Sequence, residues 1–190
     1  STDLPVDVIA QADVKVVGVT VLSPPTDIDV SENRAITVRS TLRNAGPYGP
    51  VNVEVQQSPA SPPDCEVSPA GPVNRQVNLP PNVDVTVDEQ FTIHCSEKST
   101  HTFTFETDIL RIKELHVLDP GGTNNSGSTQ LTVEAWGSVD LKIVGQHVVN
   151  PPSTIQMSQD VQIVLEKVIH NDGPYDPAQA VTETTVSAPA

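Results

Sequence analysis

Two cysteines and two histidines close to them have the clearest capacity for chemistry. Cys65 and Cys95 are the only cysteines, and their even number in a proline-rich chain predicts one disulfide bond. Two free buried thiols are the alternative. Together with His94 and His101 the cysteines offer ligands that zinc prefers, but neighbours on one strand, such as His94 and Cys95, face opposite sides of a sheet. The disulfide is therefore the simpler prediction.

The histidines do not form a recognisable catalytic set. A nucleophilic site needs a serine or cysteine beside a histidine base, and an acid that orients the base. His101, His116 and His147 instead stand alone in strand-like or turn-like sequence, and there is no glycine-rich phosphate loop. Acidic residues are abundant, but nothing singles out a catalytic pair. We therefore expect a protein that is not an enzyme and that needs no cofactor.

Acidic side chains in two places are candidates for calcium binding. Asp27, Asp29 and Glu32 have the spacing that begins a calcium loop, but the central glycine and the distal bidentate glutamate are missing. The second place is a junction between the repeats described below, where the acidic residues are Asp119, Glu134 and Asp140. No metal is expected, and Asp27 and Asp29 are the candidates if calcium binds.

The charge balance excludes several classes of partner. The 190 residues include 24 Asp and Glu but only 10 Lys and Arg, which gives a net charge of −14. Such a surface repels phosphate backbones and anionic lipid headgroups, so nucleic acids and membrane surfaces are not expected as partners. No apolar stretch approaches the ~20 residues that a membrane-spanning helix needs.

Two features indicate an extracellular or cell-surface location. A structural disulfide persists in oxidising compartments and is rare in the cytosol. Asn124 begins the sequence Asn124-Asn125-Ser126, which matches the acceptor motif for N-glycosylation in an expected exposed loop. Because such tripeptides are common by chance, Asn124 is only a candidate for modification.

The chain repeats itself at a constant offset of 127 residues. Residues 13–18 (DVKVVG) recur as residues 140–145 (DLKIVG), and residues 44–50 (NAGPYGP) recur as residues 171–177 (NDGPYDP). The residues shared by the two copies of this turn are Asn44, Gly46, Pro47 and Tyr48 in the first and Asn171, Gly173, Pro174 and Tyr175 in the second. A match of this length in register predicts a tandem repeat.

The offset divides the chain into one complete repeat and two partial ones. Residues 1–12 align with 128–139 and are expected to be the last strand of a preceding repeat, or a donor strand. Residues 13–139 form a complete repeat, and residues 140–190 form the first part of the next, with about three strands. Because a half-sandwich leaves an apolar face in water, we expect a longer polypeptide or neighbouring chains to supply its missing strands.

The elements that position all these residues are predicted to be strands. The chain has 18 prolines and 3% aromatic residues, with runs of Val, Thr and Ile between the prolines. Apolar and polar residues alternate, as at Ile36, Val38 and Leu42, which is typical of half-buried strands. About seven or eight strands are expected in an all-β, Ig-like antiparallel β-sandwich. In the repeated turn, Gly46 is expected to take a positive φ, with Tyr48 packed over it.

These motifs resemble those of a known group of domains. Asn-x-Gly-Pro at 44–47 and Asp-Pro-x-x-x-Asn-Asn at 119–125 are similar to motifs of CARDB-like and related Ig-like repeats of bacterial and archaeal cell-surface proteins. The resemblance covers the complete repeat and both partial ones. It implies long extracellular proteins used as stalks, adhesins or fibre material. The length of the repeat departs from the usual pattern because of additional residues around 96–118.

The function expected from these observations is structural. The repeats would form a stalk, a surface layer or a filament, with neighbouring repeats or subunits as partners and with strands shared between subunits as one means of assembly. An adhesin that presents loops to a receptor or glycan is the alternative. An accessory domain of a secreted enzyme is a third reading.

Overall fold

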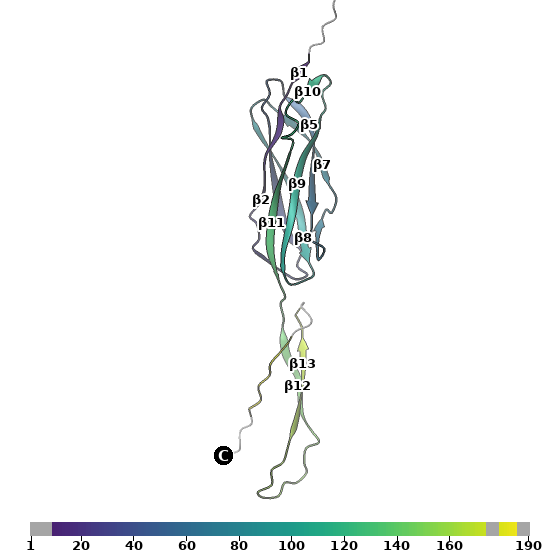
Figure 1. The fold of residues 1–190 in the computed structure, drawn as a ribbon. Helices are drawn as coiled ribbons and strands as arrows, with labels where there is room; N and C mark the ends of the chain where they lie inside the picture. The colour runs from purple at the N-terminus through teal and green to yellow at the C-terminus, as the bar shows by residue number, and fades with distance from the viewer. Residues whose placement is uncertain (1–8, 174–178, 186–190) are drawn as a thin grey trace, which may run out of the picture. The chain divides into compact units, whose positions relative to one another are not determined.

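The computed structural model describes residues 9–173 and 179–185 and is built from strands (Figure 1). The chain forms two compact units, Ser1–Trp136 and Gly137–Ala190. The boundary at 136/137 lies close to the repeat boundary that the sequence places at 139/140. No helix in the described ranges is long and apolar enough to cross a membrane.

The first unit is a β-sandwich made of two sheets. Its strands are β1 (Ala10–Gln11), β2 (Val14–Leu22), β3 (Asp27–Asp29), β4 (Arg34–Asn44), β5 (Val51–Ala60), β6 (Cys65–Ser68), β7 (Val73–Leu79), β8 (Asp84–Cys95), β9 (Thr100–Ile112), β10 (Val117–Leu118) and β11 (Ser126–Trp136). One sheet has the order β2-β4-β8-β6 and the other β3-β11-β9-β5-β7. These sheets are antiparallel except that β3 runs parallel to β11. A separate parallel pair joins β1 and β10. The predicted all-β sandwich is confirmed.

The core lies between the two sheets and follows the alternation in the sequence. In β4 the even-numbered residues from Ile36 to Asn44 are buried, while the residues between them are partly exposed. Phe91 on β8 and Phe105 on β9 meet across the core with ring centroids 5.3 Å apart. Aromatic pairs at this separation contribute about 0.5–1.5 kcal/mol beyond the burial of their surface. The two sheets are therefore held by a continuous apolar layer.

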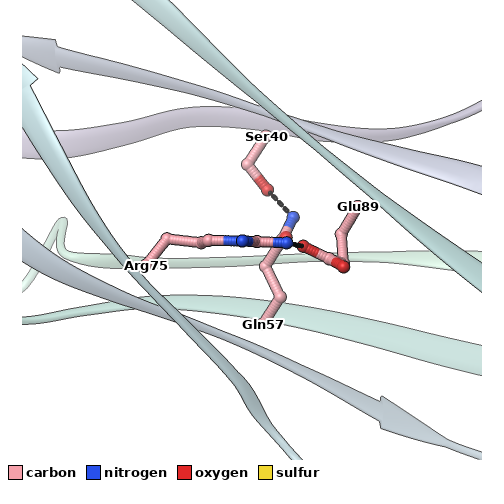
Figure 2. Close-up of polar contacts among 4 residues, drawn as sticks. All are labelled: Ser40, Gln57, Arg75 and Glu89. Atoms are coloured by element: carbon pink, nitrogen blue, oxygen red, sulfur yellow. Dashed lines mark hydrogen bonds and ion pairs between the residues drawn. The ribbon is translucent and has the colours of Figure 1, made fainter. Parts of the chain in front are cut away.

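A polar bridge crosses this apolar layer. Ser40 on β4 lies 2.7 Å from the hydroxyl of Thr107 on β9, and Gln57 on β5 donates from Nε2 to Ser40 Oγ at 2.7 Å. All three side chains are buried. Figure 2 shows this contact beside the ion pair of Arg75 on β7 with Glu89 on β8, 2.8 Å apart. Both contacts link the two sheets through side chains.

Two short strands were not anticipated from the sequence. β3 has three residues and β6 has four, which is too short for a clear alternation of apolar and polar residues. The two apolar runs expected at 83–87 and 91–95 form the single strand β8. The segment at 110–118 is divided between the end of β9 and the short β10.

The second unit contains a hairpin of two antiparallel strands, β12 (Leu141–Val149) and β13 (Val164–Asn171). The described part of this unit has these two strands, where the sequence predicted about three. Its apolar side chains are more exposed than those of the first unit. Ile163 is 59% exposed and Ile169 is 40% exposed, whereas Ile36 and Leu42, at the corresponding positions of the repeat, are 3% and 0% exposed.

Candidate functional site

The turn after β4 is organised by the buried side chain of Asn44. Its Oδ1 accepts a hydrogen bond from Gly46 N at 3.0 Å, and its Nδ2 donates to Tyr48 O at 2.7 Å. Its backbone carbonyl accepts from Asn82 N at 2.7 Å. An asparagine side chain that bonds the backbone two residues later fixes a turn without help from a neighbouring strand. This explains the Asn-x-Gly part of the motif.

Gly46 is required because two backbone segments approach closely. A Cβ on Gly46 would lie 2.4 Å from Asp13 N and 2.7 Å from Ala12 Cα. The expected positive φ at Gly46 is wrong: among the described glycines the positive φ belongs to Gly49. Tyr48 is 45% exposed, so its ring does not form the buried cover that the sequence predicted. The glycine therefore allows the turn to press against the start of β2.

The same turn is built in the second unit. Asn171 Oδ1 accepts from Gly173 N at 3.0 Å, and Asp172 N donates to Asp140 O at 2.8 Å. A Cβ on Gly173 would lie 2.6 Å from Asp140 N. Each contact has its counterpart 127 residues earlier in the chain. Pro174 and Tyr175 lie outside the described residues.

The hairpin β12–β13 also repeats the pairing of β2 with β4. The first ladder runs from Val14↔Asn44 to Leu22↔Thr37, with a shift of register between Val16 and Gly18. The second runs from Leu141↔Asn171 to Val149↔Val164, with the shift between Ile143 and Gly145. Both ends of the ladder and the irregularity therefore recur at an offset of 127 residues.

The Asp-Pro-x-x-x-Asn-Asn loop fastens β10, β11, β2 and β9 together. Asp119 accepts hydrogen bonds from Gly121 N at 3.0 Å and from Asn125 Nδ2 at 2.8 Å. Asn124 Nδ2 donates to Asp13 Oδ1 at 3.2 Å, and the Asn124 carbonyl accepts from Val16 N. The motif is therefore a structural clasp. Glycosylation at Asn124 stays a prediction, and it would have to release the hydrogen bond of Nδ2 to Asp13.

The candidate calcium ligands do not converge on one position. Asp27 and Asp29 flank the buried Ile28 on β3, and Asp29 N donates to Glu32 Oε2 at 3.1 Å, so this carboxylate caps a turn. Asp119 is tied to the loop before β11, whereas Glu134 lies eight residues along β11 from Ser126, about 27 Å of extended strand. Asp140 belongs to the other unit. Asp119 and Glu134 therefore cannot share one ion.

The two cysteines form the predicted disulfide. It joins β6 and β8 of one sheet, and both residues are buried. His101 is also buried, and its Nε2 lies 2.9 Å from the Glu97 carbonyl oxygen. Its ring nitrogen and the two sulfurs lie within 4.8 Å of one another. Because both sulfurs are bonded to each other, this cluster is a disulfide packed against an imidazole. A pocket of about 300 Å³ opens beside Cys65 and Glu66.

Two ion pairs on the outer face of the first sheet fix the partner of β4. Arg39 donates two hydrogen bonds of 2.7 Å to the carboxylate of Asp88 on β8. Arg43 bonds Asp84 in the same way, at 2.5 and 2.8 Å. These hydrogen bonds from the guanidinium groups hold the pKa values of Asp88 and Asp84 below their ordinary values. Paired, planar charges of this kind favour one register and one partner strand.

Comparisons with known proteins identify similar folds but no relative by sequence. Neither the protein-family models nor the curated proteins include a significant match. Among solved structures, the crystal structure of the CARDB domain of the PF1109 protein from Pyrococcus furiosus, in complex with di-metal ions, has 16% identity. The match covers 64% of this chain and 93% of that chain, with a TM-score of 0.42. The solution structure of the same domain has 14% identity and a TM-score of 0.39, with 66% and 98% of the two chains covered.

A third similar structure is the complex of zinc α2-glycoprotein with prolactin inducible protein from human seminal plasma. Its identity is 13%, its TM-score is 0.35, and the match covers 64% of this chain and 97% of that chain. The resemblance to CARDB domains expected from the sequence thus reappears among solved structures, as a likeness of fold. At these identities no ligand and no residue role is carried over to this chain.

Proposed function

We propose that this chain is part of an extracellular array of 127-residue β-sandwich repeats whose role is structural. The observation that carries this proposal is the recurrence of one construction in both units: the same ladder, the same register shift and the same Asn-Gly turn. A local resemblance of sequence would not require all three to keep one offset. The second unit is then the beginning of another sandwich of the same kind.

The arrangement of the first unit suits it to carry tension. The chain enters beside the Asn44 turn, where Ala45 N bonds Asp13 O, and leaves at Trp136, whose carbonyl bonds Val30 N at the opposite end of β4 (Figure 1). A pull on the two ends therefore acts along the strands. Since ladder hydrogen bonds are perpendicular to antiparallel strands, the pairs of β2 with β4 and of β11 with β9 must break together.

The disulfide supports both the mechanical role and the proposed location. It encloses a sequence separation of 30 residues between β6 and β8, so this part of the sandwich cannot extend under load while the bond is intact. A bond of this kind is stable outside the reducing cytosol. The proposed location is therefore the cell surface or the extracellular space.

The mass of the polypeptide in its native source tests the array. Denaturing mass spectrometry should give a mass above the 20.2 kDa of the 190 residues, with the excess accounted for by further repeats of about the same length. Partial proteolysis should cut between repeats and yield a ladder of fragments that differ by one repeat. A native mass equal to that of this chain, with no further repeats, would contradict the proposed array.

A further inference from the structure

The hairpin β12–β13 presents an open strand edge whose occupant has a definable chemistry. In the first unit, the edge of β4 that faces away from β2 is covered by β8 over the ten residue pairs from Arg34↔Ile93 to Arg43↔Asp84. In the described part of the chain, β13 pairs with β12 alone. The inference rests on the proposed equivalence of the two hairpins, and it concerns which strand can take the place of β8.

The inner face of the hairpin requires an occupant with alternating apolar residues. Ile163, Leu165 and Ile169 occupy the positions of Ile36, Val38 and Leu42, which are buried in the first unit. Both isoleucines are at least 40% exposed in the hairpin. An antiparallel strand that alternates apolar and polar residues would cover this face and satisfy the backbone edge from residue 164 to residue 170.

The outer face selects against the strand that β4 uses. Arg39, which binds Asp88 of β8, is replaced in the repeat by Glu166. Arg43, which binds Asp84, is replaced by His170. A strand of the β8 type would therefore place the carboxylate of Asp88 opposite that of Glu166, and like charges directly opposite each other destabilise a pair of strands.

The groups around Glu166 leave its open side available. On β12 the residue opposite it is His147, with Nε2 3.3 Å from the Glu166 carboxylate. The side chain of Glu166 is 57% exposed. His170 lies one turn of the pleat away and pairs with Asp172 at 2.5 Å. A cation on an incoming strand would thus approach Glu166 from the side opposite His147.

We infer that the β13 edge binds an antiparallel strand with Lys or Arg at the position facing Glu166, and that it discriminates against strands of the β8 type. The reversal of charge keeps the strands of neighbouring sandwiches from being exchanged while the backbone geometry stays the same. The β8 strand of a second copy is unsuited for another reason as well, because the disulfide holds it to β6.

Two peptides that differ by one charge test this inference on the full chain. The first has the sequence of residues 84–95 with Cys95→Ser, and the second carries Asp88→Lys in addition. Binding is measured by isothermal titration calorimetry at about pH 8, where imidazoles are largely neutral. The lysine peptide should bind about five- to tenfold more tightly, and added salt should reduce this preference.

Matched variants locate the effect. Glu166→Lys in the chain should reverse the preference between the two peptides, whereas Glu134→Lys on β11 of the first unit should leave it unchanged. A third peptide with Asp84→Lys, which faces His170, should differ from the first by less than about twofold because the neutral imidazole carries no charge.

Four results would overturn the inference. They are binding of neither peptide, equal binding of both, a preference that Glu166→Lys does not reverse, and self-association of the chain through β13 in sedimentation velocity that Glu166→Lys does not change. The native mass is independent of this experiment. A repeat-stepped mass with no charge preference refutes only the strand chemistry, while a preference with no further repeats in the native mass refutes only the array.

Discussion

Replacing Gly46 by alanine should destabilise the first unit strongly, because the repeated turn has no room for a methyl group. The new Cβ would lie 2.4 Å from Asp13 N, 2.7 Å from Ala12 Cα and 2.9 Å from Ala12 C. Real Cβ contacts are longer than 3.0 Å, so backbone must move on at least one side. Ala12 and Val14 are 0% and 1% exposed, and a shift of this segment therefore opens the core.

The cost should lie near the upper end of the range for overpacked sites, about 3 kcal/mol, because both neighbours are backbone. For a domain of this size such a loss lowers the melting temperature by about 10 °C. Urea unfolding followed by the fluorescence of Trp136, the single tryptophan, measures the change in the transition midpoint. The slope of the transition should stay the same.

Gly71→Ala is the matched control, because no atom lies within 4 Å of the position of its new Cβ. This variant should stay within about 0.5 kcal/mol of the parent chain. If Gly46→Ala were as stable as Gly71→Ala, the close approach of the turn to β2 would not exist in solution. The explanation given for the conserved form of the turn in both units would then be wrong.

Three further predictions concern the first unit. Replacing both cysteines by alanine should lower the free energy of unfolding by about 3–4 kcal/mol, from the loop entropy of a 30-residue separation; chemical denaturation measures this, and a loss below 1 kcal/mol would contradict it. Ser40→Ala should cost about 1–3 kcal/mol because Gln57 Nε2 loses its buried acceptor, and a melting curve unchanged from the parent would refute the polar bridge. The lowered pKa values of Asp84 and Asp88 mean that their contribution to stability is present above their unfolded pKa and is lost as the pH falls through the folded pKa. Acid titrations of stability should therefore be shallower for the double Asp→Asn variant, and equal slopes would show that these pairs do not form in solution.

The fold class could be predicted because alternation and turn residues act over short distances. Ile36, Val38 and Leu42 predict the inner face of β4 directly, and the structure buries all of them. The disulfide could be predicted from composition and spacing for the same reason. The short strands β3 and β6 could not, because three or four residues carry too little periodicity to distinguish a strand from a loop.

The role of individual motif residues was less predictable than their importance. Gly46 and Asn44 stand out by their repetition, but only the packing of the turn against Ala12 shows why glycine is needed there. The exchange of Arg39 for Glu166 is visible in the sequence once the offset is known. Its meaning depends on the pairing of Arg39 with Asp88 on β8, which is 49 residues away in the chain. Contacts at such separations are set by the tertiary fold.

Hydrogen–deuterium exchange on the polypeptide from its native source tests the central claim most directly. If a second sandwich is completed around β12–β13, the amides of residues 164–170 that face away from β12 should be protected like those of β4 that bond β8. In the 190-residue chain the same amides should exchange rapidly. Equal, rapid exchange in both polypeptides would contradict the account, since the hairpin would then not be the beginning of a second repeat.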